Sequence, residues 1–153
     1  MQTITIDNAT PSDIPVLVEL LAELFSIEAD FKPDTERQVL GLSLLLSNAE
    51  QAVIKVARDT AKDGAVVGMV SAQLVISTAQ GTPSAWLEDM VVSHEYRSAG
   101  IGRQLLDAVQ EWAKARGATR AQLLVDTENL PAIGYYQHLG WESTQLQARR
   151  LFF

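Results

Sequence analysis

The stretch EYRSAGIGRQLL, residues 95–106, decides how the fold of this sequence is interpreted. It places Gly100 and Gly102 between a run typical of a strand and an apolar-periodic stretch typical of a helix. Such a turn leaves backbone N–H groups free at a helix N-terminus, where the helix dipole favours phosphate. Arg97 and Arg103 can add charge-assisted bonds to the same anion. The alternative is a tight glycine turn with no ligand.

Two well-known phosphate motifs do not match this stretch. A P-loop requires Gly-Lys-Ser/Thr, whereas Arg103 and Gln104 follow Gly102. A dinucleotide fingerprint requires a third glycine where Leu105 stands. Asp126 lies roughly where the ribose-binding acid of that fold belongs, but the chain after residue 97 is too short for the βαβαβ unit. Both readings are therefore disfavoured.

The rest of the chain predicts a single domain, residues 1–153, in which helices and strands are mixed. Strands are expected at residues 3–7, 52–58, 66–77, 86–92, 121–125, 141–145 and 148–153. Helices are expected from residues 12–13, with Pro15 just inside, and at about residues 34–47, 100–116 and 130–139. Asp63-Gly64 favours a hairpin turn. The order β-α-α-β-β-β-α-β-α-β-β predicts an α/β (α+β) fold: a mixed, mostly antiparallel sheet of about seven strands with four helices.

Composition narrows the function classes. The chain has no cysteine, which excludes disulfides, thiolate metal sites and a thiol nucleophile, and its two histidines lie far apart. We therefore expect no metal. No apolar run is long enough to span a membrane, and the N-terminus lacks the pattern of a signal peptide, so we expect a cytoplasmic protein without a membrane partner.

The net charge of −7 is unevenly distributed along the chain. Residues 1–63 carry 11 acidic and 5 basic side chains, a net charge of −6, whereas residues 64–153 carry 8 and 7, a net charge of −1. An acidic surface repels nucleic acid and attracts cations, so a nucleic-acid partner is not expected. The alternative is a solvated surface that serves solubility.

Two segments together resemble a known family. Residues 92–106 are similar to the acetyl-CoA motif of the GNAT superfamily of N-acetyltransferases, Arg/Gln-x-x-Gly-x-Gly/Ala after the fourth strand. Residues 129–141 are similar to its Asn-x-x-Ala-x-x-Phe-Tyr-x-x-x-Gly-Phe motif, with Tyr135 and Trp141 replacing the two phenylalanines. With the element order, the resemblance covers nearly the whole chain. It implies a GNAT fold and an acyl-CoA-dependent N-acetyltransferase with some similarity to diamine acetyltransferases.

The resemblance also implies a donor site for acetyl-CoA. The pantetheine arm would pair with the fourth strand beside Val91 and Val92, and Asn129 would touch it from the fifth-strand side. The coenzyme A pyrophosphate would meet the backbone of Arg97, Ser98, Ala99, Gly100, Ile101, Gly102 and Arg103.

For catalysis, the family's chemistry implies direct attack of an amine on the thioester in a ternary complex. Tyr136 stands at the family's usual position for the acid that protonates the leaving thiolate, and the alternative is an aromatic packing residue. Glu88, in a Leu-Glu-Asp run similar to that of diamine acetyltransferases, is the candidate base, acting through water. Asp89 or a water chain to the strand backbone remains an alternative base.

The acceptor is predicted to be a small cationic primary amine, such as a polyamine, a basic amino acid or an amino sugar. Acids and phenylalanines alternate in residues 23–31, and we expect Phe25, Glu28 and Phe31, with Asp89, to contact it. Three alternatives stay open: a protein or peptide amine as acceptor, a non-catalytic acyl-CoA sensor, and acids that only face solvent. The apolar C-terminal residues 149–153 are expected either to pack across a homodimer or to form a buried strand of the monomer.

Overall fold

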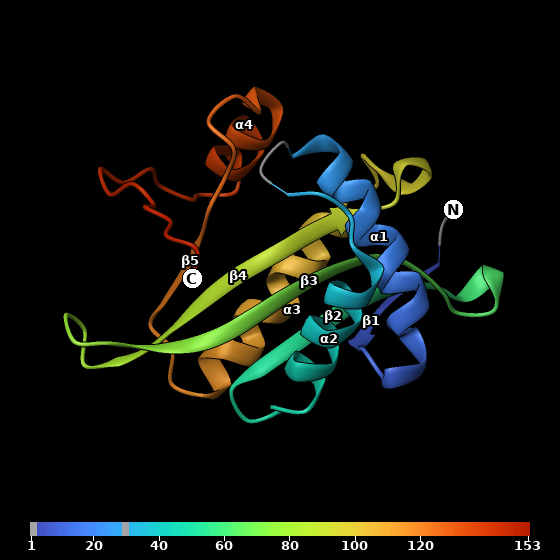
Figure 1. Ribbon diagram of the computed structural model, residues 1–153, viewed down its shortest axis with the longest axis horizontal. Helices are drawn as coiled ribbons and strands as arrows, with labels where there is room; N and C mark the ends of the chain where they lie inside the picture. Colours follow the sequence, from blue (N-terminus) through green and yellow to red (C-terminus); the bar gives the residue numbers. More distant parts are fainter. Residues whose placement is uncertain (1–2, 29–30) are drawn as a thin grey trace. The chain divides into compact units, whose positions relative to one another are not determined.

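The computed structural model describes residues 3–28 and 31–153 (Figure 1). The chain divides into two compact units, Met1–Leu123 and Leu124–Phe153, and each is described by itself. No helix in the described part of the chain is long and apolar enough to cross a membrane.

The first unit is built on one sheet whose five strands lie in chain order. The strands are β1 (Ile4–Asn8), β2 (Ala52–Asp59), β3 (Ala65–Ser77), β4 (Thr82–Val92) and β5 (Arg120–Leu123). The first four pair antiparallel, and β5 pairs parallel to β4, so the sheet is mixed.

Helices cover both faces of this sheet (Figure 1). They are α1 (Ile14–Ile27), α2 (Thr35–Leu46) and α3 (Ile101–Ala115), joined by short 3-10 turns η1 (Pro11–Asp13), η2 (Thr60–Lys62) and η3 (His94–Tyr96). In Figure 1, α1 and α2 lie in front of the sheet and α3 lies behind it. Because both faces are covered, β2 is almost entirely buried.

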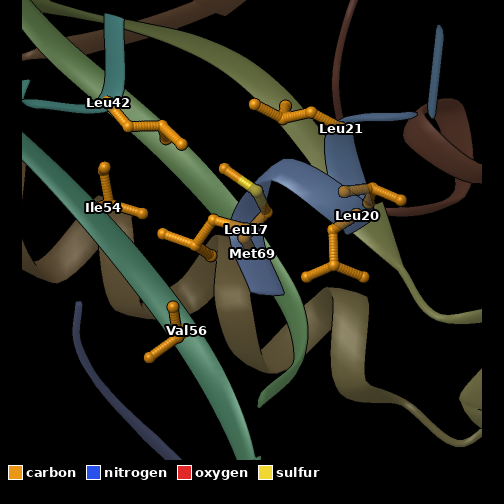
Figure 2. Close-up of a cluster of buried hydrophobic side chains, with 8 residues drawn as sticks. Leu17, Leu20, Leu21, Leu42, Ile54, Val56 and Met69 are labelled. Atoms are coloured by element: carbon orange, nitrogen blue, oxygen red, sulfur yellow. The ribbon is translucent and has the colours of Figure 1, made fainter. Parts of the chain in front are cut away.

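The hydrophobic core follows from the apolar stripes of these helices. On the α1 and α2 face, eight buried side chains form one cluster, shown in Figure 2: Leu17, Leu20, Leu21, Leu42, Ile54, Val56, Met69 and Val91. On the other face, α3 buries the side chains that recur at helical spacing: Ile101, Leu105, Leu106, Val109, Trp112 and Ala113. Burial of each large aliphatic side chain contributes roughly 1.5–3 kcal/mol, so these two layers hold the helices on the sheet.

The start of α1 is fixed to the sheet by a half-buried ion pair. Asp13 accepts hydrogen bonds from Arg58 Nη1 at 3.0 Å and Nη2 at 2.8 Å, and also from the backbone N–H of Thr10 at 2.8 Å. Pro15 lies in the first turn, where its missing N–H costs nothing. The hydrogen bonds from Arg58 hold the pKa of Asp13 below its ordinary value of 3.8.

A β-bulge interrupts β4 near its C-terminal end. Ser71 of β3 pairs with Glu88 and Met69 pairs with Val91, so residues 89 and 90 together oppose a single residue of β3. Asp89 adopts the left-handed conformation, with φ 56°. The pairing of β5 with β4 ends at Leu87, so beyond this residue the outer edge of β4 has no strand beside it among the described residues.

The prediction of about seven strands is wrong, since the described residues form five. Residues 141–145 and 148–153 form no strand in the described chain, although their apolar patterns favour one. A strand requires a neighbouring backbone in register, and β5 is paired only with β4. Leu151, Phe152 and Phe153 are exposed, so the buried C-terminal strand is also wrong. The four helices are confirmed, the last being α4 (Leu130–His138).

Replacing Asp13 by Asn is expected to destabilise the fold by about 2 kcal/mol, because Arg58 loses the charge of its doubly hydrogen-bonded partner and keeps only the exposed Asp7 carboxylate, 3.5 Å from its Nε, among the ion pairs of the described residues. Since the pKa of Asp13 is lowered in the folded state, its contribution is present above pH ~4 and is lost as the pH falls through the lowered value. Urea unfolding between pH ~3 and ~7 measures both effects. Asp107→Asn on the exposed face of α3 is the matched control, and equal losses in the two variants would contradict the role of the pair.

Candidate functional site

The glycine loop, residues 97–103, runs from η3 into the first turn of α3. Ser98 and Gly100 adopt left-handed conformations, with φ 64° and 79°, and Gly100 is the N-cap residue of α3. Glycine adopts this conformation without steric cost. The hydrogen bond from Gln104 N–H to the Gly100 carbonyl, at 3.2 Å, begins the helical ladder, and no side chain of the described residues caps this end. The N–H groups of residues 101–103 therefore point out of the helix end as free donors.

Two sets of contacts, one buried and one at the surface, hold η3, the turn that precedes the glycine loop. On one side, the Tyr96 hydroxyl donates to Asp59 Oδ2 at 2.7 Å, and Asp59 Oδ1 accepts from Ala61 N–H at 3.0 Å. On the other side, Glu23 Oε1 of α1 accepts from His94 N–H at 3.0 Å and from Arg97 Nη2 at 2.8 Å. The turn is thus tied to the end of β2 and to α1.

The two arginines of the glycine loop differ in what they contact. The guanidinium of Arg97 lies against the protein surface, where Nε donates to the Val92 carbonyl at 3.0 Å and Nη2 donates to Glu23. Arg103 is exposed, and no ion pair is found for it within residues 3–28 and 31–153. Of the two side chains expected at an anion, Arg103 is the one whose charge is not already neutralised.

The open edge of β4 lies directly before the glycine loop. Val91 is buried in the core cluster and Val92 is half-buried, so their side chains are fixed by packing. Ser93 N–H still donates to the Val67 carbonyl of β3 at 2.8 Å, so pairing continues on that side only. The opposite edge offers backbone donors and acceptors to an extended ligand.

Three carboxylates lie near one another where β4 bulges. Glu88 pairs with Ser71 on the sheet face covered by α1 and α2, and its exposed carboxylate accepts from Trp86 Nε1 at 3.2 Å. Asp89 is half-buried, and burial raises its pKa from 3.8 to about 6, with further contributions from the charges of Glu88 and Glu28. Glu28 directly follows α1. The cluster therefore repels anions and favours a cation.

Two aromatic rings lie at the same end of α1. Phe25 packs against the core cluster, and its ring centroid lies 6.0 Å from that of Phe31, which is partly exposed. Asp30, which belongs to the predicted acceptor stretch, lies outside the described residues.

The second unit carries the remaining predicted site residues on α4. Asn129 is the N-cap residue, and its side-chain oxygen accepts from Ala132 N–H at 3.2 Å. Tyr136 is half-buried, with its ring centroid 5.6 Å from Tyr135 and 5.9 Å from Trp141. Edge-on aromatic contacts of this kind fix the orientation of a phenol ring.

The sequence pattern did not single out Asp59, Tyr96 or the role of Glu23. Their contacts span 37 residues for Tyr96–Asp59 and 74 for Arg97–Glu23, so no local spacing could have indicated them. Tyr96 is buried in the structure, and its hydroxyl therefore needs the partner that Asp59 provides, but the sequence does not indicate that burial.

Comparison with known proteins agrees with this geometry. The model of the acetyltransferase (GNAT) family matches residues 15–141. The chain is 28% identical over 144 residues to an aminoglycoside N(6')-acetyltransferase type 1 of Stenotrophomonas maltophilia, covering 92% of this chain and 88% of that protein.

Solved structures show the same fold. A possible acetyltransferase from Clostridium difficile 630 has a TM-score of 0.85 at 18% identity, covering 98% of this chain and 97% of that chain. Glucosamine-6-phosphate N-acetyltransferase from Arabidopsis thaliana has a TM-score of 0.78 at 20% identity, covering 99% of each chain. The chain belongs to the acetyltransferase (GNAT) family and is an acyl-CoA-dependent N-acetyltransferase.

Proposed function

We propose that this enzyme transfers the acetyl group of acetyl-CoA to a small cationic primary amine by direct attack in a ternary complex. The observation that supports this proposal most directly is the group of three carboxylates, Glu28, Glu88 and Asp89. Burial raises the pKa of Asp89 to about 6, and the charges of Glu88 and Glu28 add to that rise, so the three groups lie close enough to interact. A cationic acceptor relieves this repulsion, whereas an anionic one would increase it. The relative of Stenotrophomonas maltophilia is named for aminoglycosides, which makes amino sugars the first acceptors to test.

The first unit has the features that a coenzyme A donor requires. The free N–H groups at the start of α3 suit the pyrophosphate, and exposed Arg103 adds a positive charge. The edge of β4 beside Val91 and Val92, where no described strand pairs, suits the amides of the pantetheine arm, although the Val92 carbonyl already accepts a hydrogen bond from Arg97 Nε. Gly100 adopts its positive φ of 79° without the strain that a side chain would bring, and nothing lies within 4 Å of the place where a Cβ would stand.

Proton removal from the acceptor is assigned to Glu88. An alkyl ammonium has a pKa near 10, so it must lose a proton before its nitrogen can attack the thioester carbon. Glu88 is exposed and its carboxylate is oriented by Trp86, so it can accept this proton through a water molecule. Asp89 serves mainly to attract the cation, because its carboxylate is less accessible and already shares the field of two other acids.

Proton delivery to the leaving group is assigned to Tyr136. As the carbon–nitrogen bond forms, the carbon–sulfur bond breaks and the sulfur leaves with the electron pair. The phenol of Tyr136 would give its proton to that sulfur, and Asn129, on the same unit, would contact the pantetheine arm. The ring contacts with Tyr135 and Trp141 hold the phenol in one orientation.

Tyr136→Phe is expected to lower kcat at least about tenfold, because the thiolate then leaves without a proton donor. The assay is free-thiol release from acetyl-CoA across a panel of amino sugars, polyamines, basic amino acids and peptides. Tyr135→Phe, which removes the neighbouring hydroxyl, is the matched control and should retain activity. Full activity in Tyr136→Phe would contradict the acid role, and acetyl-CoA binding without thiol release from any amine would favour a sensor.

The pH dependence of KM and kcat should distinguish the roles of the two acids of β4, Glu88 and Asp89. Because the pKa of Asp89 is about 6, its carboxylate becomes negatively charged as the pH rises through 6, and the KM for a cationic amine is expected to fall about fivefold. Asp89→Asn should abolish this change. Glu88→Gln should instead lower kcat at every pH. The comparison uses steady-state kinetics between pH ~5 and ~8. A reversed pattern, with kcat lost in Asp89→Asn and retained in Glu88→Gln, would assign the base to Asp89.

A further inference from the structure

Glu23 lies on α1, far in sequence from the glycine loop, yet it contacts the start of that loop directly. Its Oε1 accepts two hydrogen bonds, from His94 N–H at 3.0 Å and from Arg97 Nη2 at 2.8 Å. The side chains of Glu23 and Arg97 are only 31% and 39% exposed, so this pair is partly shielded from water. One carboxylate oxygen thus connects a core helix to both ends of η3.

Arg97 extends this connection to the end of β4. Its Nε donates to the Val92 carbonyl at 3.0 Å, and Nη1 lies 3.5 Å from His94 Nδ1. The guanidinium therefore joins β4, η3 and α1 at one point. A planar fork with several donors can bridge such partners in a fixed geometry, which lysine cannot do.

The residue that follows this junction adopts a conformation that needs support. Ser98 is not a glycine but has φ 64°, a backbone region that costs a non-glycine residue on the order of 1 kcal/mol. Such a conformation persists where the surrounding contacts determine it. Glu23 and Arg97 provide those contacts on one side of η3, and the Tyr96–Asp59 hydrogen bond provides them on the other.

We infer that Glu23 is a positioning residue for the donor site: through Arg97 and His94 it fixes the direction in which the glycine loop presents its backbone N–H groups. The guanidinium of Arg97 consequently has a structural role in holding the loop, and Arg103 is the cation that contacts the phosphate. This inference rests on the proposed function, in which the glycine loop binds the pyrophosphate of coenzyme A.

The test is the affinity for acetyl-CoA, measured by calorimetry without an acceptor at about 50 and 300 mM salt. Glu23→Gln is expected to raise the Kd about tenfold, since the loop loses its fixed direction. Glu19→Gln, on an exposed position one turn earlier on α1, is the matched control and should leave the Kd within about twofold. The double variant with Arg97→Gln should be no weaker than Arg97→Gln alone, because both changes break the same contact.

The salt dependence of binding shows whether Arg97 has a structural role or contacts the phosphate directly. Arg103→Gln should make the affinity for acetyl-CoA fall less steeply with salt, whereas Arg97→Gln should leave this salt dependence unchanged. These two variants test the inference even if Glu23→Gln fails to fold. An unchanged Kd in Glu23→Gln, or a slope flattened by Arg97→Gln, would overturn the inference while the proposed function stands. If the unmodified enzyme fails to bind acetyl-CoA, the proposed function falls and the inference falls with it.

Discussion

The backbone of β4 between Leu87 and Val92 pairs with β3 on one side, whereas no strand of the described residues pairs with it on the other, and this constraint organises the first unit. Pairing with β3 continues to the end of the strand, while β5 stops at Leu87. The bulge at residues 89–90 takes Asp89 out of the regular ladder, directly after Glu88, which still pairs with Ser71. The same strand therefore offers backbone groups for a donor and carboxylates for an acceptor, and it leads straight into the glycine loop.

Helix α1 connects these parts to the core. Its buried leucines pack on the sheet, and the Asp13–Arg58 pair fixes its first turn to β2. Further along, Glu23 contacts the glycine loop, and Glu28, which directly follows the helix, lies near Asp89 of β4. A helix held this firmly at its start can position both the glycine loop and the carboxylate of Glu28, because close packing in the core restricts its movement.

What could be predicted from the sequence was local. Gly100 and Gly102 before an apolar stripe predicted the turn and α3 correctly, because helix spacing and glycine conformation depend on neighbouring residues. The two C-terminal strands were predicted wrongly, because alternation at residues 141–153 shows a tendency to extend but cannot show a pairing partner. The bulge at Asp89 and the Glu23–Arg97 contact were not predictable either, since both depend on register or on contacts 74 residues apart.

The central claim is that the open edge of β4 and the glycine loop together hold the acetyl donor. It is tested most directly by following the backbone amide signals of the enzyme by NMR while acetyl-CoA is added. The account predicts that the largest shifts fall on residues 88–92 and 98–103, with the N–H groups of residues 101–103 moving as they bind the pyrophosphate. Saturable shifts confined to other residues, with these amides unchanged, would contradict it.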